Sequence, residues 1–449
     1  MTMIRSFLRP CAAGLITFFA ATTTHSSAQA QDAAVAPPPP SRDADSPPPT
    51  PFVLSDHWFM GITGQFEGRA HKDADLDANT EGDIANIKPG VKLAVLYERP
   101  GSFRFFSATK ITRDLEVNED STPEHRELLA ELDEFYVRWI PFQNGIVSIG
   151  RSRMNDPRNW LFASSDDMND NIQLQYRDDT DFFQVVAAAR DLLPSNLFEP
   201  SDQHRSLNYA ATFEHNFPNG MRAGGFLLLQ NRVNEGDSVD RTYFGARSRG
   251  TLAAGHIDYW TDTVVLRGTA GTTQMRSYAF DGGVIYKFLD TLQFHVVGSY
   301  AYGSGDGNAA DGVDHRFRQT GIQENRYQYG GVSRFKYYGE SLNPELSNLA
   351  VATAAVGFKP DTLSSIDLVA HHYELAHANG GLIAGRLNRQ PTGASHNAGN
   401  ALDLVAGYRD RTAMEFEFFG GWFMPGPAFG PYRTDSVYGM FKLKYNLRP

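Results

Sequence analysis

Three arginines lie close together in the stretch GRSRMNDPRNWLF, which begins at Gly150. They are Arg151, Arg153 and Arg158, and they follow an apolar run that ends at Ile149. A planar guanidinium can donate two parallel hydrogen bonds to one carboxylate, so a cluster of this kind suits the recognition of repeated acidic groups. Whether these arginines can do so depends on the element that carries them and on the side of it that they occupy.

The beginning of the chain has the pattern of a secretory signal over residues 1–30. A positive start and a short apolar run precede Ala28-Gln29-Ala30, which has the small residues of a cleavage site. Residues 31–56 are rich in proline, and such a segment is extended and builds no core, which predicts a periplasmic spacer. We therefore expect one large domain over residues 57–449.

Composition narrows the class of protein. The chain has 449 residues with 41 Lys and Arg against 52 Asp and Glu, a formal net charge of −11. Removing Arg5 and Arg9 with the predicted signal gives 39 − 52 = −13, and so acidic a chain is a poor candidate for binding nucleic acid. The single cysteine, Cys11, lies within the predicted signal, so we expect neither disulfides nor thiolate chemistry.

One pattern repeats after Trp58. Runs of about ten residues alternate apolar and polar side chains, and Gly, Asn, Asp and Pro separate the runs. Because successive side chains of a strand point to opposite faces, each run predicts a strand with one apolar and one polar face. The clearest runs are SLNYAATFEHNF from Ser206, LQFHVVGSYAY from Leu292, MEFEFFGGWF from Met414 and SVYGMFKLKYNL from Ser436.

A soluble β-sandwich alternates in the same way, so other features must decide between the two folds. The predicted signal, the 31 Phe and 19 Tyr, and the small number of strands that are apolar on both faces favour a transmembrane β-barrel. We count roughly twenty candidate strands, and a closed antiparallel bacterial barrel needs an even number. The sequence therefore predicts an all-β barrel that is apolar outside and wet inside.

Alternation assigns the arginines to different faces. Arg138 lies on the polar parity of the run EFYVRW and is predicted to face the lumen. Arg151 and Arg153 share the parity of Ile149, and an arginine facing the middle of the hydrocarbon costs about 2 to 4 kcal/mol. Either the strand has left the lipid by that point, or Gly150 is a bulge that switches the parity, which is the alternative we favour.

An aromatic-rich segment lies farther along the chain, with Tyr327, Tyr329, Phe335 and Tyr337 on one parity. We expect a strand of the barrel wall whose aromatic rings join the girdle at the membrane interface. Its opposite face then carries polar side chains into the lumen. These are Arg326, Gln328, Arg334, Lys336 and Glu340.

Several motifs follow one another in a fixed order over nearly all of the predicted domain. The piece IVSIGRSRMNDPRNWLF precedes DGGVIYKF, SYAYGSGDG, FRQTGIQENR, GGVSRFKYYGE, NPELSNL and SSIDLVAHHYE. This ordered set resembles the outer-membrane alginate export family, from about residue 57 to the C-terminus. The resemblance implies a monomeric antiparallel barrel of about 18 strands with long extracellular loops, in the outer membrane of a Gram-negative bacterium. It also implies passage of alginate or a similar anionic polysaccharide.

Carboxylates recur along such a polymer, and numerous weak contacts would let it move from one guanidinium to the next. Arg138 is a candidate lumen residue because it lies on the polar face of its predicted strand. Lys336 and Glu340 are candidates because they lie on the polar face of the aromatic segment. The resemblance implies the remaining positions, with either Arg151 or Arg153 in the first motif. The predicted substrate-binding residues are Arg138, Arg151, Arg153, Arg158, Arg318, Arg334 and Lys336, with Asp166, Asp167 and Glu340 as gating or charge-partner residues.

Other readings stay open. The motif HHYE, with His371, His372 and Glu374, could belong to a barrel enzyme, but neighbouring histidines of a strand point to opposite faces. A general or substrate-selective porin for uptake of small anions or oligosaccharides would use the same barrel, and a structural or adhesive barrel would have an occluded lumen. We expect no catalytic residue, metal or cofactor. The expected partners are the polysaccharide, outer-membrane lipid and periplasmic secretion or scaffold proteins.

Overall fold

The computed structural model describes residues 50–78, 83–117, 128–153, 168–189, 205–233, 238–288, 291–308, 310–323, 325–410 and 412–449, together with Leu192 and Leu197. These residues all belong to one structural unit, Ala44–Pro449. The predicted signal and most of the predicted spacer lie outside the described residues. Among the described residues, no helix has the length and the apolar character that crossing a membrane would take.

Nearly every regular element among the described residues is a strand, as the repeated alternation predicts. Two short 3₁₀ helices, η2 (Ala253–Gly255) and η3 (Pro427–Phe429), lie in connections. The strands are β1 (Phe52–Ser55), β2 (Trp58–Lys72), β3 (Ile84–Arg99), β4 (Phe103–Arg113), β5 (Leu115–Glu116), β6 (Leu128–Phe142), β7 (Gly145–Arg153), β8 (Met168–Arg177), β9 (Asp181–Ala189), β10 (Arg205–Asn216), β11 (Met221–Val233), β12 (Ser238–Leu252), β13 (Ile257–Ala270), β14 (Thr273–Lys287), β15 (His295–Gly303), β16 (Val313–Asp314), β17 (Arg326–Tyr327), β18 (Phe335–Lys336), β19 (Leu349–Phe358), β20 (Ser364–Leu375), β21 (Asn397–Asp410), β22 (Met414–Pro425) and β23 (Ser436–Asn446).

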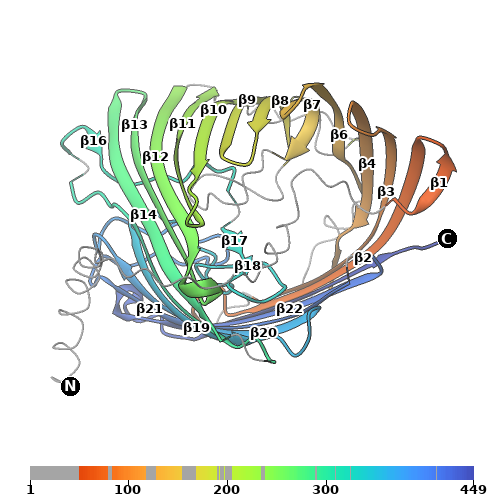
Figure 1. Ribbon diagram of the computed structural model, residues 1–449. Coiled ribbons are helices and arrows are strands. Elements are labelled where there is room, and N and C mark those ends of the chain that lie inside the picture. The colour runs from red at the N-terminus through yellow and green to blue at the C-terminus, as the bar shows by residue number, and fades with distance from the viewer. Residues whose placement is uncertain are drawn as a thin grey trace, which may run out of the picture. The chain divides into compact units, whose positions relative to one another are not determined.

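The wall of the molecule is a closed antiparallel barrel (Figure 1). Each wall strand pairs with the next along the chain, and β23 pairs with β2 from Thr63 opposite Asn446 to Lys72 opposite Val437. Of the 23 strands among the described residues, β1, β5, β16, β17 and β18 are accessory, which leaves 18 in the barrel. Closure leaves no unpaired sheet edge toward lipid, and it confirms the predicted fold.

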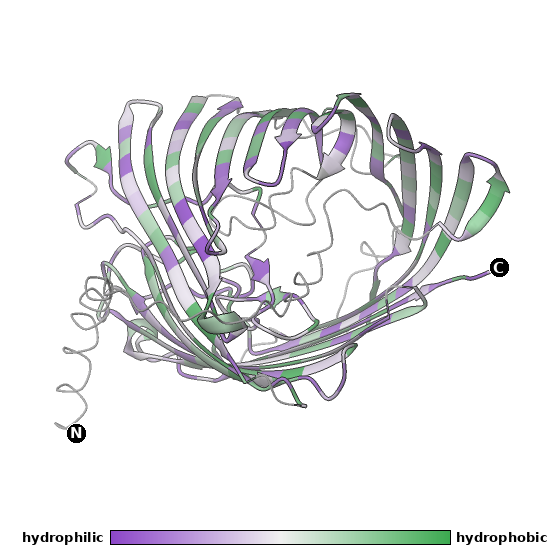
Figure 2. Ribbon diagram, viewed as in Figure 1, coloured by the Kyte–Doolittle hydropathy of each residue, from purple (hydrophilic) through white to green (hydrophobic). Residues whose placement is uncertain are grey.

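Outward side chains of the wall are apolar, whereas inward ones include both polar residues and buried apolar residues such as Leu228, Val369 and Phe419. Bands of hydrophobic and hydrophilic residues alternate along the strands in Figure 2. In β22, Phe416 and Trp422 are 36% and 44% exposed, whereas Glu415 and Glu417 are 9% and 7% exposed. The strands β10, β15 and β23 repeat this arrangement, as predicted. The face that contacts lipid is therefore built from exposed hydrophobic residues.

The two ends of the barrel differ in the length of their connections. Short turns join β3 to β4, β6 to β7 and β8 to β9 at one end, whereas residues 304–348 join β15 to β19 and residues 376–396 join β20 to β21 at the other. Bacterial barrels have short periplasmic turns and longer extracellular loops, which assigns the two long connections to the extracellular end. These connections are the long extracellular loops that the resemblance implies.

The aromatic segment around residues 326–337 is not a strand of the wall, so that prediction is wrong. It forms the β17–β18 hairpin within residues 304–348, with Arg326 opposite Lys336 and Tyr327 opposite Phe335. Phe335 and Tyr337 are almost completely buried in the main hydrophobic cluster, not placed at a membrane interface. Their alternation is that of a hairpin packed inside the barrel, where β17 and β18 lie in Figure 1.

Residues 304–348 are here called the inward loop, and those of them that the structure describes pack against the inner faces of β11–β15 and β19–β21. The ring of Tyr329 stacks on Trp260 of β13, with 6.0 Å between centroids. The Tyr338 hydroxyl donates a hydrogen bond of 2.5 Å to Asp281 of β14, and its carbonyl accepts one of 2.8 Å from Tyr373 of β20. Several strands of the wall thus hold the loop against one side of the lumen.

Gly150 is not a bulge, contrary to our expectation. The pairing of β7 with β6 and with β8 runs through Gly150 without a shift of register. Its φ of +129° favours glycine, and a Cβ atom there would lie 2.2 Å from the Phe135 carbonyl oxygen. The regular register therefore places Arg151 opposite Asp170, on the same face of β7 as Ile149.

Candidate constriction in the barrel lumen

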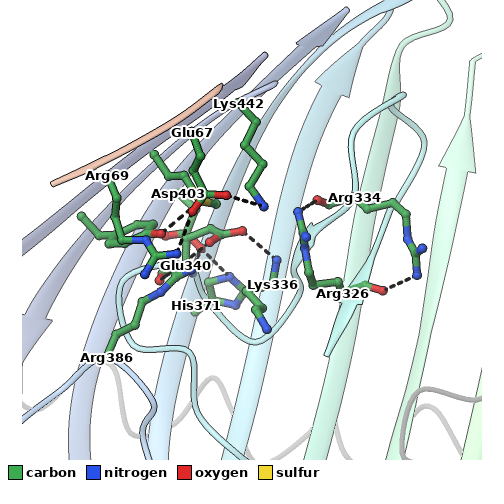
Figure 3. A network of polar contacts seen from close by, with 12 residues as sticks. Glu67, Arg69, Arg326, Arg334, Lys336, Glu340, His371, Arg386, Asp403 and Lys442 are labelled. Atoms are coloured by element: carbon green, nitrogen blue, oxygen red, sulfur yellow. Dashed lines mark hydrogen bonds and ion pairs between the residues drawn. The ribbon is translucent and has the colours of Figure 1, made fainter. Parts of the chain in front are cut away.

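The tip of the inward loop carries three cationic side chains, Arg326, Arg334 and Lys336, here called the hairpin cations. Each arginine braces the opposite strand of the hairpin. Arg326 Nη2 donates to the Arg334 carbonyl oxygen at 2.9 Å, and Arg334 Nη2 donates to the Arg326 carbonyl oxygen at 3.2 Å (Figure 3). All three residues are half-buried. The hairpin from residue 326 to residue 336 contains these three cations and no acidic residue.

The turn of the hairpin is pressed against the wall. A Cβ atom on Gly331 would lie 2.3 Å from Asp367 Oδ2 and 2.4 Å from Ser365 Oγ, both on β20. The Val332 amide donates to that serine oxygen at 2.8 Å. Glycine is therefore required at the turn because the backbone approaches the wall closely, and this contact fixes the position of the hairpin cations.

Glu340 lies directly after the hairpin and is completely buried. Its Oε1 accepts the Lys336 amide at 2.8 Å, and its Oε2 accepts Arg386 Nη1 at 2.7 Å. Its own amide donates to Asp403 Oδ2 of β21 at 2.8 Å. Burial raises the pKa of the Glu340 carboxyl, but the charges of Arg386 and Arg326 lower that pKa further, so it lies below its ordinary value.

Arg386 belongs to the connection between β20 and β21 and is mostly buried. Its guanidinium lies over the ring of Tyr438 on β23, 3.7 Å from the centroid. On the adjoining strands, Glu67 accepts Arg69 at 2.8 Å and pairs with Lys442 at 3.3 Å. In Figure 3 these groups gather around Glu340 together with Lys336, whereas Arg326 and Arg334 are joined to each other and lie to one side.

The wall formed by β2–β7 bears inward charges that pair with one another. Lys92 contacts Asp133 and lies 3.3 Å from Glu134, and Lys110 lies 3.3 Å from Glu131. We call this stretch of wall the paired wall. In the ring of 18 strands, β6 and β7 stand nine strands from β15 and β19 in either direction, on the opposite side of the barrel.

Arg138 of the paired wall lies on the inward parity, since its neighbours Val137 and Trp139 are exposed on the outer face. Its Nε donates to Ser148 Oγ of β7 at 3.2 Å, and its guanidinium lies 5.4 Å from the centroid of the Tyr136 ring. The structure thus places Arg138 on the opposite side of the barrel from the strands that hold the hairpin.

Arg151 is held by a carboxylate of the next strand. Its Nε and Nη2 donate to the two oxygens of Asp170 at 2.9 and 3.0 Å, and both side chains are buried. This bidentate pair reduces the cost of a charge on the outward parity. Arg153 ends β7 opposite Met168, and Arg158, Asp166 and Asp167 lie outside the described residues.

Arg318 lies in the inward loop, where its Nη2 donates to Asp314 at 3.0 Å. Its carbonyl oxygen accepts the Tyr243 hydroxyl of β12 at 3.1 Å, which fastens the loop to the wall. The structure therefore brings Arg334, Lys336 and Glu340 together, and it places Arg138, Arg151 and Arg318 elsewhere.

Sequence reasoning missed Arg386 and Asp403, and it gave Arg326 no role in binding. The Gly330-Gly331 pair between two aromatic runs is a hairpin signal that could have placed Arg326 beside Arg334. No local signal marks Arg386, because its partner Glu340 lies 46 residues away.

The HHYE motif contains one inward and one outward histidine, as expected. His371 is buried, with Nδ1 2.9 Å from Thr353 Oγ1 and Nε2 3.3 Å from Asp403 Oδ2. His372 is partly exposed and lies 2.9 Å from Asn400 Oδ1. Within the part of the chain that the structure describes, no group of three or more His, Cys, Asp or Glu residues could hold a metal ion.

A family model described as Alginate export matches residues 57–438, which is most of the chain. The chain belongs to the alginate export family. This confirms the resemblance seen in the ordered motifs, and together with the barrel it places the protein in the outer membrane of a Gram-negative bacterium.

Two curated relatives share this family resemblance over shorter lengths. "Alginate production protein AlgE" of Pseudomonas aeruginosa is 28% identical over 251 residues, which is 46% of this chain and 50% of the relative. The protein of the same description in Azotobacter vinelandii is 32% identical over 98 residues, 22% of this chain and 19% of that relative. The chain thus matches half or less of the length of these relatives.

Solved structures with a similar fold have little sequence in common with the chain. Acinetobacter baumannii OccAB1 superposes with a TM-score of 0.55 at 10% identity, covering 87% of this chain and 96% of that one. Pseudomonas aeruginosa OccK2 (OpdF) gives a TM-score of 0.55 at 11% identity, covering 87% and 97%. At such identities the similarity establishes the barrel fold alone.

Proposed function

We propose that the protein is a channel that passes an anionic polysaccharide, alginate or a similar polyuronate, across the outer membrane. Family membership and the description of the relative from Pseudomonas aeruginosa support this substrate class. The observation that carries the proposal is the hairpin at the tip of the inward loop, which presents three cations and no acid within the barrel.

The passage runs between the hairpin cations and the paired wall. Arg326, Arg334 and Lys336 contact the carboxylates of the polymer on one side, and Arg138 of β6 contributes from the other. Each cation also makes contacts within the protein, so its hold on a passing carboxylate is moderate, as conduction requires. Arg151 and Arg318 serve the structure instead, because Asp170 and Asp314 bind their guanidinium groups.

Current blockade in planar lipid bilayers tests the substrate. Oligouronates added to one side of a single channel should interrupt the ion current at concentrations at which neutral oligosaccharides of the same length do not. High salt should weaken the blockade, because exposed charges are screened. Equal blockade by charged and neutral oligomers would contradict polyuronate recognition and would favour a general pore.

A further inference from the structure

The outer face of the barrel carries an apolar groove that the proposed function does not use. Its volume is about 730 Å³, and its lining includes Leu368 of β20, Leu404 of β21, Gly420 of β22 and Gly439 of β23. We propose that this groove binds an acyl chain of lipid A, the phosphorylated glycolipid that anchors lipopolysaccharide in the outer leaflet of the outer membrane. The inference concerns the surface that faces lipid, and it does not depend on the polymer that passes through the lumen.

The floor of the groove is open because its residues are small. On the outer face, Ala70 of β2 lies beside Gly439, and Gly439 lies beside Gly420. A Cβ atom on Gly439 would meet no atom within 4 Å, and one on Gly420 would lie 3.5 Å from the edge of the Phe418 ring. Neither glycine has a positive φ, so these positions provide space for a ligand and not a turn of the backbone.

Larger side chains form the walls of the groove. Trp422 and Val437 lie two residues from the glycines toward one end of the barrel, and both are exposed on the outer face. Phe418 lies two residues from Gly420 toward the other end. Surrounding lipid is as apolar as the groove, so dispersion contacts must hold a chain there. An acyl chain in the groove contacts its floor and both walls, whereas one on a flat surface is contacted from one side.

The groove lies in the extracellular half of the barrel wall. β21 begins directly after the long extracellular connection of residues 376–396, and Leu402 in its first half pairs with Trp422. Lys72 is the last residue of β2 and pairs with Val437, so it lies at the same end. The floor begins two residues farther into the membrane, about 7 Å along the strand. The acyl chains at this depth belong to the outer leaflet, which lipopolysaccharide forms in Gram-negative bacteria.

A cation lies at the extracellular rim of the groove. The Lys72 side chain is 67% exposed on the outer face, and its Nζ lies 4.0 Å from Asp73 Oδ2, which is too far for a hydrogen bond. Asp83 also lines the rim, and its Oδ1 accepts the Asp73 amide at 2.9 Å. A lysine at this level extends its amine into the headgroup layer, where it pairs with a lipid phosphate. Trp422, whose Nε1 donates to Asp435 at 2.9 Å, marks the same interface.

The position of Lys72 favours lipid A over other occupants of the groove. A phospholipid of the inner leaflet would place its phosphate at the periplasmic end of the wall, away from this lysine. A second copy of the chain on this face would enclose Lys72 in an apolar contact, and the burial of a charge without a strong partner is costly. A phosphate above and an acyl chain below match the order of the cation and the groove along the strands.

Native mass spectrometry of the full chain in detergent, with hexa-acylated lipid A added, tests the inference. The wild type should retain one bound lipid A, and G439W should lose it because the indole fills the groove. G298W is the matched control, since a Cβ atom on Gly298 of β15 also meets no atom within 4 Å and this outward position lies away from the groove. K72Q should weaken binding about fivefold, because one lysine near anionic lipid contributes about 1 kcal/mol.

Three results would overturn the inference. Equal binding of lipid A by folded G439W and G298W would show that the groove is not the site. Binding of added phosphatidylethanolamine in place of lipid A, lost in G439W, would assign the groove to a phospholipid. A wild-type dimer that G439W abolishes would assign it to a second copy of the chain.

A second variant decides if G439W does not fold. Ala70 is an exposed residue of the same floor, and A70F places a ring in the groove without changing either glycine. Loss of lipid A from A70F would support the inference, whereas unchanged binding would contradict it.

Discussion

The two sides of the lumen use the same strand pattern for different purposes. On β11–β15 and β19–β21, here called the packed wall, inward groups such as Trp260, Asp281 and Asp403 hold the inward loop. On the paired wall, inward charges such as Lys92 and Glu134 hold one another across neighbouring strands. A polar inward residue therefore does not by itself line a passage, and its partners decide whether it anchors a loop or remains near the substrate.

The largest effect on stability is expected when a side chain of the packed wall that holds the inward loop is removed. Trp260 is buried, stacks on Tyr329 and donates its Nε1 proton to Asp281 at 2.7 Å. We expect W260A to destabilise the protein by about 3 to 5 kcal/mol and to raise the single-channel conductance as the inward loop loosens. Denaturant unfolding and single-channel recording measure the two effects.

Trp422 provides the matched control, because it lies on the outer face, 44% exposed. W422A should cost much less free energy of unfolding and should leave the conductance unchanged. Similar losses in the two variants would mean that the inward loop is not held by the packed wall.

The inner and outer faces should respond oppositely to charge. Leu404 lies near the middle of β21 on the outer face. L404R should reduce the free energy of unfolding by about 2 to 4 kcal/mol, because the arginine would face hydrocarbon. K442R, which places the same side chain on the inner face beside Glu67, should change it little. An equal cost for both variants would contradict the assignment of the faces.

A smaller effect is expected at a turn outside the barrel wall. Hydrogen bonds from the Leu363 and Ser364 amides and from the Ser364 hydroxyl lower the pKa of the Asp361 carboxyl. Because the folded-state pKa is the lower one, Asp361 stabilises the fold above its unfolded-state pKa, and this contribution is lost as pH falls through the folded-state value. D361N should remove that part of the acid dependence in unfolding experiments at about pH 2 to 5, the range around an ordinary Asp pKa of roughly 3.9.

Asp56, an exposed residue of the turn between β1 and β2, serves as the control at the same end of the barrel. D56N should leave the acid dependence of stability as it is in the wild type. A D361N variant with an unchanged pH profile would show that the turn contacts do not contribute to stability.

The barrel and its two faces could be predicted because the alternation of apolar and polar residues is present within each wall strand. Glu415 and Glu417 alternate with Phe416 within one strand, so the pattern needs no distant information. The inward loop was not predicted because its aromatic residues, such as Tyr329 and Phe335, alternate with polar residues as those of a wall strand do. A hairpin packed against the wall has the same two-residue period of side chains.

Residues of the candidate site could be predicted only where they lie in a recognisable motif or on the polar face of an alternating segment. Arg334, Lys336 and Glu340 share one segment and were found together, although the segment was assigned to the wrong element. The partnership of Arg151 with Asp170 depends on which strands lie side by side, and that of Arg386 with Glu340 depends on how two loops meet inside the barrel. The charges of these residues do not indicate either arrangement.

In our proposal the cations at the tip of the inward loop set the ion selectivity of the lumen, and the reversal potential of the triple variant R326Q/R334Q/K336Q tests this role. In a gradient of a simple salt, the wild-type channel should prefer anions and the triple variant should lose that preference, while the paired-wall variant R138Q keeps most of it. An unchanged reversal potential in the folded triple variant would show that these cations do not set the selectivity.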